Sequence, residues 1–478
     1  MTKNSHVPHD QLVADINAGV IDTVLAVFGD HAGRLVGKRT DGAFYLDVVH
    51  GEGTENCDYL IACDIDNTPI PGFRWASYQQ GYGDMRGVVD ESTVRYLPWI
   101  ARTAMVLVDL VDVDTASPVE VSPRRILQAQ VEKAAAAGYV PMIGSEIEFF
   151  LFKEPYDEAH RLGYRGLTPN SPYVEDYHIL QTTKEEDVVG AIRRGLAEAG
   201  MPVEFSKGEA GRGQHELNLT YTTAVEMADI NLLFKNAVKE IAHACGKSAT
   251  FMAKPHFDDA GSSCHIHSSL WSPDGVALMP ATHGDHGDHG DHDDHGDHDD
   301  HDDHDPHHMS QLFRWYVGGM IETARDFSLL MAPTVNSYKR FLPGSWAPTG
   351  IGWAVDNRTL GFRVVGHGKG MRVENRIPGA DANTYHAFAA TIAGGLYGIA
   401  EQIEPGPPYS GNGYTASDLP RIPSTFVEAI ELWRDSKIAV DCFGEDVHQH
   451  VLVHAEAEWS AFNQTVTEWE RARYFERI

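Results

Sequence analysis

A short segment with two glutamates beside an apolar run places the strongest constraint on the fold. Residues 144–152 read GSEIEFFLF, a pattern that predicts a β-strand entering a core. Successive side chains of a strand point to opposite faces, so Glu146 and Glu148 share one face. Two carboxylates that point the same way repel each other unless a cation lies between them. The segment therefore predicts a metal site or, in the simpler interpretation, a solvated strand face.

Three further segments carry residues that could complete a metal site. The segment VEFSKGEAGRGQHELN places Glu209 and Glu216 on either side of a glycine-rich turn, where the backbone can approach a ligand closely. The segment GSSCHIHSSLW puts His265 and His267 on one strand face, and MRVENRIPG places Glu374 between two arginines. Each residue alone is more often a satisfied core or surface group. Together, carboxylates with one histidine indicate Mg²⁺ or Mn²⁺ rather than zinc.

Five arginines in the C-terminal third of the chain could bind an anionic ligand. Their side chains supply the positive charge that carboxylate and phosphate groups need. The simpler interpretation of any one of them is a surface ion pair. The candidates are Arg340, Arg358, Arg363, Arg372 and Arg376.

Composition divides the chain into two parts and one insertion. Residues 16–115 alternate short β-rich runs with Gly and Pro turns, as a small mixed-sheet domain would. A helix is expected after residue 118, with Ser122 as its cap and Gly138 at its end. Residues 283–308 hold ten histidines and eleven aspartates in a three-residue repeat with almost nothing to bury. We interpret this tract as a loop insertion, or as a segment that orders around a metal.

Charge and cysteine usage exclude several classes of protein. A net charge of −31 argues against nucleic acid or an anionic membrane as partner, since both call for a basic surface. Five scattered cysteines without a C-x-x-C pair predict reduced thiols. The apolar run 384–400 contains His386 and predicts a buried helix rather than a membrane span. We expect a cytoplasmic protein.

Six segments, in order, carry a family resemblance. They are GSEIEFFLF, GEAGRGQHE, TFMAKPHFDDAGSSCHIHSSLW, PTVNSYKRFLPGSWAP, DNRTLGFRV and RVENRIPGADANTYHA. Together they resemble the signature segments of the glutamine synthetase family, from about residue 20 to the C-terminus. The resemblance implies an α+β fold: a small N-terminal β-grasp-like domain (16–115) and a large C-terminal catalytic domain (118–478) with a curved antiparallel sheet.

The resemblance also implies an activity and residue roles. The family joins glutamate to an amine with ATP, through a γ-glutamyl phosphate, and uses two or more Mg²⁺ or Mn²⁺ ions. By similarity, Glu148, Glu209 and Glu216 would hold one metal, and Glu146, His265 and Glu374 would hold a second. Glutamate would contact Gly261, Arg340, Arg358 and Arg376, with Arg358 also catalytic and, with Arg363, facing the phosphates. Nucleotide would contact Glu204, Tyr221, His267, Ser269, Arg363 and Arg372.

The small domain is expected to serve a neighbouring subunit. Its segment GYGDMRG matches one that the family contributes to an adjacent active site, with Asp84 as the catalytic residue carried over. This implies a homo-oligomer, a dodecamer of two hexameric rings. The family segment with the acid that deprotonates ammonium is not recognisable. Asp64 and Asp66 are nearby acids, and neither is assigned.

One departure from the family bears on the substrate. Ammonia-using members carry a glutamate where GSWAP places Trp346. An aromatic face attracts a cationic amine by about 0.5–2 kcal/mol and also contacts a carbon chain. We therefore predict an organic amine, a small monoamine such as ethanolamine or else a polyamine. The alternatives are a Trp346 that is only a surface residue, an ammonia-using glutamine synthetase, and a non-catalytic metal-binding scaffold.

Overall fold

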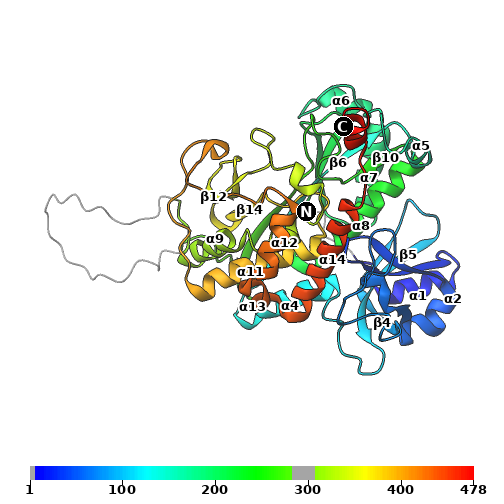
Figure 1. Cartoon of the computed structure of the whole chain (residues 1–478). Coiled ribbons are helices and arrows are strands. Elements are labelled where there is room, and N and C mark those ends of the chain that lie inside the picture. Colours follow the sequence, from blue (N-terminus) through cyan, green and yellow to red (C-terminus); the bar gives the residue numbers. More distant parts are fainter. Residues whose placement is uncertain (1–5, 282–306) are drawn as a thin grey trace, which may run out of the picture.

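Two β-sheets organise the chain, which we describe from a computed structural model that covers residues 6–281 and 307–478. The smaller sheet lies at one end of the molecule, with helices α1 and α2 beside it (Figure 1). Its strands follow the order β2-β1-β5-β4-β3, in which β1 and β5 are parallel and the other pairs antiparallel. The strands are β1 (Thr23–Gly29), β2 (Leu35–Asp41), β3 (Thr54–Cys57), β4 (Asp84–Tyr96) and β5 (Thr103–Asp112).

The larger sheet has nine strands in the described residues and holds the predicted strand at its centre. Its main path runs β12-β13-β14-β11-β6-β8-β7, and the short strands β9 and β10 also pair with β6. All pairs are antiparallel except β12 with β13. The strands are β6 (Val140–Phe152), β7 (Val203–Gly208), β8 (Gln214–Leu219), β9 (Thr222–Thr223), β10 (Ser248–Thr250), β11 (Cys264–Trp271), β12 (Gly350–Val355), β13 (Leu360–Val365) and β14 (Arg372–Asn375).

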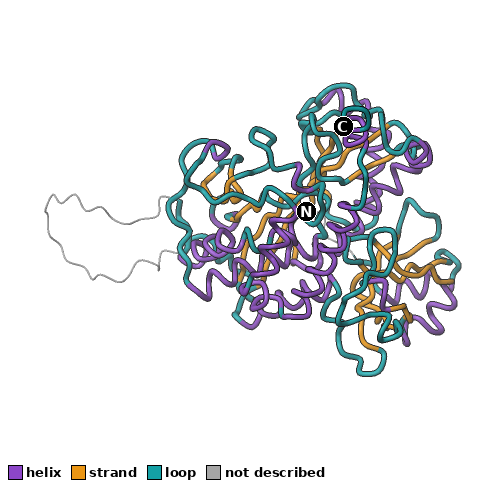
Figure 2. The backbone as a smooth tube through the Cα atoms, viewed as in Figure 1, coloured by secondary structure: helices purple, strands orange, loops and turns teal. Residues whose placement is uncertain are grey.

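Helices cover one face of the large sheet, as the distribution of helices and strands in Figure 2 shows. Ile147 and Phe149 on β6 and Ile266 on β11 are buried on this face, where α8 packs on β6 and α11 on β11. The α-helices are α1 (His9–Asn17), α2 (Gly42–Phe44), α3 (His50–Glu52), α4 (Pro123–Ala136), α5 (Tyr156–Arg161), α6 (Ile179–Lys184), α7 (Glu186–Glu198), α8 (Ala224–Ala244), α9 (Gln311–Thr323), α10 (Ser328–Met331), α11 (Thr384–Glu401), α12 (Phe426–Asp435), α13 (Lys437–Phe443), α14 (Glu445–Asn463) and α15 (Glu468–Tyr474).

The predicted apolar helix is α11, and it is buried along most of its length. It packs against α9 through glycines that let the two backbones approach closely. A Cβ atom added to Gly319 would lie 2.1 Å from the carbonyl oxygen of Gly394 and 2.4 Å from Cα of Gly398. The small residues in this part of the sequence therefore set the distance between two core helices.

The helix expected after residue 118 is present as α4, with one difference at its start. Gly138 lies just past its end with φ of 86°, in the left-handed region that glycine adopts without strain. Ser122 occupies the N-cap position, but its side chain makes no capping hydrogen bond. Pro123 follows directly at the first helical position, where its missing N–H and fixed φ suit a helix start without a side-chain cap.

The α+β class with two sheets is confirmed, whereas the domain boundary near residue 118 stays a prediction. No helix in residues 6–281 and 307–478 is long and apolar enough to cross a membrane. The His/Asp tract lies outside the described residues, apart from His307 and His308.

Candidate functional site

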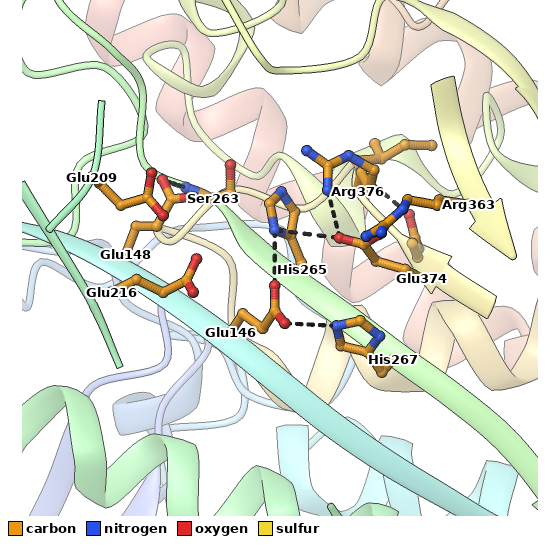
Figure 3. A network of polar contacts seen from close by, with 12 residues as sticks. Glu146, Glu148, Glu209, Glu216, Ser263, His265, His267, Arg363, Glu374 and Arg376 are labelled. Carbon is orange, nitrogen blue, oxygen red and sulfur yellow. Dashed lines mark hydrogen bonds and ion pairs between the residues drawn. The ribbon is translucent and has the colours of Figure 1, made fainter. Parts of the chain in front are cut away.

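The register of the large sheet brings the predicted metal-binding residues onto one face. Glu146 on β6 pairs with His265 on β11, and His267 on β11 pairs with Glu374 on β14. On the other side of β6, Glu148 pairs with Glu216 on β8. Directly paired residues point to the same face of a sheet. This face is the one opposite helices α8 and α11, and Figure 3 shows the side chains converging there.

One group of these residues surrounds Glu146. Its carboxylate lies 3.0 Å from Nε2 of His267 and 3.4 Å from Nδ1 of His265, which is also 3.6 Å from Glu374. Burial opposes ionisation of Glu146, but the two histidines hold its pKa below the ordinary value. Burial likewise opposes ionisation of Glu374, and Arg376 and His265 hold its pKa at about 2. Both carboxylates are therefore anions at neutral pH.

A second group consists of Glu148, Glu209 and Glu216 with Lys207 beside them. Lys207 forms an ion pair with Glu209, and its Nζ lies 3.4 Å from Glu216. Burial and the charge of Glu209 raise the pKa of Glu148 to about 8. Burial and the charge of Glu146 raise the pKa of Glu216, against the opposing charge of Lys207. One ammonium does not balance three converging carboxylates.

These carboxylates fit a hard divalent cation. Ionised carboxylates in a buried site cost free energy unless a cation compensates them. The raised pKa values of Glu148 and Glu216 reflect this cost in the absence of a cation. Mg²⁺ and Mn²⁺ prefer carboxylate oxygens, with an imidazole also acceptable to Mn²⁺. The donor set therefore suits one such ion beside Glu148 and another beside Glu146.

Three of the residues predicted to bind glutamate lie together. Arg340 is 1% exposed, and its guanidinium donates to the carbonyl oxygens of Ile377 (2.7 Å) and Arg376 (3.0 Å). A Cβ atom on Gly261 would lie 2.8 Å from Cγ of Arg340, so only glycine fits there without displacement. The Nε atoms of Arg340 and Arg376 are buried and have no hydrogen-bond partner within the described chain. Such donors could receive an anionic ligand.

Arg363 and Arg358 differ in position. Arg363 bridges two acids, since Nη1 donates to Glu374 (3.0 Å) and Nη2 donates to Asp356 (2.8 Å). Arg358 is exposed in the turn between β12 and β13. No hydrogen bond or ion pair joins it to another described residue. The structure thus places Arg363 on the metal-binding face, whereas Arg358 lies in an exposed turn.

Most of the residues predicted to contact nucleotide line one pocket of about 280 Å³. Arg372 closes one side, where its Nε donates to Nδ1 of His267 at 3.1 Å and its Nη1 donates to the carbonyl of Gly370 at 3.0 Å. The pocket also touches Glu146, so it opens toward the carboxylates. Arg363 is not among its lining residues. The predicted residues that do line it are Glu204, Tyr221, His267, Ser269 and Arg372.

Trp346 lies at the tip of a turn that is fixed to Arg340. The Ser345 hydroxyl donates to the carbonyl oxygens of Leu342 (2.6 Å) and Arg340 (3.0 Å). The Trp346 side chain is 60% exposed, and its φ of 63° lies in the left-handed region. A large indole held outward in a sparsely populated backbone conformation indicates a role other than core packing.

Asp84 lies in the small sheet, away from this face. It is exposed at the start of β4 and pairs with Cys57 on β3. No hydrogen bond or ion pair joins it to the other predicted site residues among those described. Asp64 and Asp66 are also in this part of the chain, in a turn where Asp64 accepts the backbone N–H groups of Asp66 and Thr68.

Sequence reasoning missed several residues that support the site. Gln214 and the backbone N–H of Ser263 both donate to one oxygen of Glu148, at 2.9 and 2.8 Å. Asn218 pairs with Glu146 across β6 and β8, and Lys207 pairs with Glu216 across β7 and β8. The period of two in VEFSKG and QHELNL could have revealed Lys207 and Asn218, because both share a face with predicted ligands. The same period of two places Gln214, two residues before Glu216, on this face as well.

Comparisons with known proteins bear on the whole chain. A family model described as "Glutamine synthetase, catalytic domain" matches residues 120–291 and 296–474. Gamma-glutamylethanolamide synthetase GlnA4 of Streptomyces coelicolor is 43% identical over 98% of this chain and 96% of its own. Glutamate–isopropylamine ligase of a Pseudomonas species is 32% identical over 96% of both. A solved structure titled "GmaS/ADP complex-Conformation 1" has a TM-score of 0.80 at 24% identity and covers 97% of this chain and 99% of its own.

Proposed function

The chain belongs to the glutamine synthetase family, and on that premise we propose that it ligates the γ-carboxylate of L-glutamate to an organic amine at the expense of ATP. The observation that carries the proposal is the sheet register that gathers carboxylates and a histidine on one face beside a pocket, with Arg363 and Arg376 paired to Glu374. A carboxylate needs activation before an amine can attack it, and phosphorylation supplies a leaving group. The two relatives named above are both amine ligases by name.

The reaction has two balanced steps. An oxygen of the glutamate γ-carboxylate attacks the terminal phosphorus of ATP, and ADP leaves. The amine nitrogen then attacks the acyl carbon, the carbon–oxygen bond to phosphate breaks, and the nitrogen gives up a proton. Divalent cations, when bound, neutralise the charge that develops between carboxylate and phosphate.

The residues of this chain would divide the work as follows. Arg340 and Arg376, with Gly261, orient the glutamate through charge and close backbone approach. Arg363 and Arg358 face the transferred phosphate. The metal ligands are Glu148, Glu209 and Glu216 for one ion and Glu146, His265 and Glu374 for the other. The nucleotide lies in the pocket lined by Glu204, Tyr221, His267, Ser269 and Arg372.

The oligomer completes this assignment. Asp84 is exposed on the small sheet and far along the chain from the metal-binding face. We assign it to the active site of a neighbouring subunit, in a cytoplasmic dodecamer of two hexameric rings. The Mg²⁺ or Mn²⁺ ions, two or more per site, would then lie close to a boundary between subunits.

Trp346 carries the choice of amine. Its exposed indole offers an aromatic wall on the turn that is anchored to Arg340. Small monoamines such as ethanolamine or isopropylamine are the first candidates, because one charge and a short carbon chain match one aromatic face. Polyamines come second, since a further positive charge would favour further acids.

A phosphate-release assay with ammonia, ethanolamine, isopropylamine and putrescine tests both parts. We expect a monoamine to give the highest kcat/KM, and we expect Trp346→Glu to shift the ratio of monoamine to ammonia by about 2- to 30-fold toward ammonia, the equivalent of 0.5–2 kcal/mol. Trp469→Glu is a matched control, because Trp469 is similarly exposed (62%) on α15. A wild-type preference for ammonia would instead make the protein a glutamine synthetase. An unchanged ratio in Trp346→Glu would reduce Trp346 to a surface residue.

A further inference from the structure

Four histidines gather where the small sheet meets the helices of the larger part of the chain. His31 lies in the loop between β1 and β2, and His386 is in the first turn of α11. His450 and His454 are four residues apart on α14, so they share one face of that helix. None of the four is among the predicted metal ligands of the large sheet. Nothing in the proposed ligase reaction uses them.

Three of the rings are placed as metal ligands could be. The rings of His31 and His454 stack with centroids 3.6 Å apart, and the ring of His450 meets them at 5.7 and 4.8 Å. One nitrogen from each of these three side chains lies within 4.8 Å of the other two. Three nitrogens that share one Zn²⁺ at 2.0–2.1 Å are roughly 3.3 Å apart. The stacked rings of His31 and His454, whose planes differ by 8°, would have to tilt to bind one ion, because a metal lies in the plane of each imidazole that binds it.

Buried nitrogens without partners point to a missing ligand. Nδ1 of His31 and Nε2 of His450 are buried and have no hydrogen-bond partner among the described residues. Leaving such groups unsatisfied costs free energy, and most buried polar atoms in proteins are paired. A metal ion would satisfy both nitrogens at once.

The surroundings orient the rings from behind. Nε2 of His454 lies 3.1 Å from the carbonyl oxygen of Ile61, so Nε2 carries the proton and Nδ1 has the free lone pair. The side chain of Asn383 donates to the carbonyl oxygens of Asp30 and His31, both at 3.0 Å, and fixes the loop that carries His31. Metal-binding histidines commonly have this kind of support from a backbone carbonyl.

A cavity gives access to the cluster. It has a volume of about 670 Å³ and reaches both His31 and His454. Its lining carries charges of both signs, with the acids Asp64 and Glu458 on the side of the cluster that includes His454 and the bases Lys235 and Lys239 elsewhere along it. The cavity also leaves room for a water molecule as fourth ligand.

We propose that His31, His450 and His454 bind one transition-metal ion of the Zn²⁺ class, at a site separate from the carboxylates of the large sheet. Imidazole nitrogens suit Zn²⁺, Ni²⁺ and Co²⁺, whereas carboxylate oxygens suit Mg²⁺ and Mn²⁺, so the two sites select different metals. The ion joins the β1–β2 loop to α14 and thereby fixes the small sheet against the helices. Its role is structural.

Zinc stoichiometry in the full chain tests the site. Wild type, His450→Gln and His448→Gln are stripped with EDTA, titrated with Zn²⁺ against a chelator and analysed for metal per chain. His448 is a matched control on the same helix, since it lies outside the cluster and its Nε2 contacts the carbonyl of Trp433 at 2.6 Å. The His/Asp tract is identical in all three proteins, so any metal that it binds cancels. We expect His450→Gln to lose one Zn²⁺ per chain and His448→Gln to lose none.

Equal zinc stoichiometry in wild type and His450→Gln would overturn the proposal. If His450→Gln does not fold, crystals of the wild-type protein soaked in Zn²⁺ decide the question by anomalous scattering at the zinc edge. A peak among His31, His450 and His454 is expected. Anomalous peaks elsewhere on the chain, with none among these three rings, would also overturn it.

Discussion

In the absence of metal, Glu148 should lower the free energy of unfolding of the protein. Its pKa of about 8 in the folded chain contrasts with about 4.3 for an unfolded glutamate. At pH 7 the folded group is therefore mostly protonated and the unfolded group ionised, so folding takes up a proton. Stability consequently falls as pH rises from about 4.3 to 8, by up to roughly 1.4 kcal/mol per pH unit, or about 3–4 kcal/mol at pH 7.

Glu148→Gln removes this penalty while keeping the main contacts. The side-chain oxygen of glutamine can still accept from Gln214 and from the N–H of Ser263, which contact a single oxygen of Glu148. In EDTA at pH 7 we expect the variant to have the higher free energy of unfolding, with about 3–4 kcal/mol as an upper limit. The advantage should shrink by about 2 kcal/mol at pH 5.5, where less of the unfolded carboxyl is ionised.

Divalent metal should reverse the order. Wild type gains about 2.7 kcal/mol when the free metal is one hundred times its Kd, whereas a glutamine in place of one ligand carboxylate reduces that gain. Unfolding in urea, followed by tryptophan fluorescence with EDTA or with Mn²⁺, measures both effects. Glu198→Gln, at an exposed position on α7, serves as control. A Glu148→Gln variant that is less stable than wild type in EDTA at pH 7 would refute the reasoning.

Two further predictions concern the core. Burial lowers the pKa of Lys235 to about 8, so above pH 8 the unfolded chain binds more protons than the folded chain. From pH 7.5 to 10 the free energy of unfolding of wild type should therefore rise by roughly 2–3 kcal/mol relative to that of Lys235→Met. A difference between the two proteins that stays constant with pH in urea unfolding would contradict this. Gly319→Ala should lower the free energy of unfolding by about 1–3 kcal/mol, because the added Cβ would meet the backbone of α11. Gly51→Ala is the control, since a Cβ there meets nothing within 4 Å. Equal thermal midpoints for the two variants would contradict the packing argument.

The period of two in the predicted strands was enough to predict much of the site from the sequence. GSEIEFFLF predicted that Glu146 and Glu148 share a face, and β6 with its neighbours confirms this. The pairing partners of these residues could not be predicted from local sequence patterns, because the register that sets His265 opposite Glu146 joins residues far apart in the sequence. The period of two places Gln214 on the face of Glu216, whereas its hydrogen bond to Glu148 depends on the pairing of strands far apart in the sequence.

Other expectations met limits of a different kind. Ser122 has the right residue type and position for a cap, yet its side chain makes no capping bond. The positions of the two arginines also depend on acids that the local sequence does not reveal. Arg363 donates to Glu374 and Asp356, whereas Arg358 is exposed in the turn between β12 and β13. In the four-histidine junction only the spacing of His450 and His454 on one helix was visible in the sequence, because the tertiary fold brings His31 and His386 to them from two other elements.

The left-handed backbone at Trp346 limits how this position can be varied. With φ of 63°, β-branched side chains such as Val, Ile and Thr would be strained there, whereas Gly, Asn and Asp tolerate the conformation best. A library designed to alter amine choice should therefore include Gly, Asn and Asp at residue 346 and leave out Val, Ile and Thr. Ser345 should be left unchanged, because its two hydrogen bonds hold the turn against Arg340.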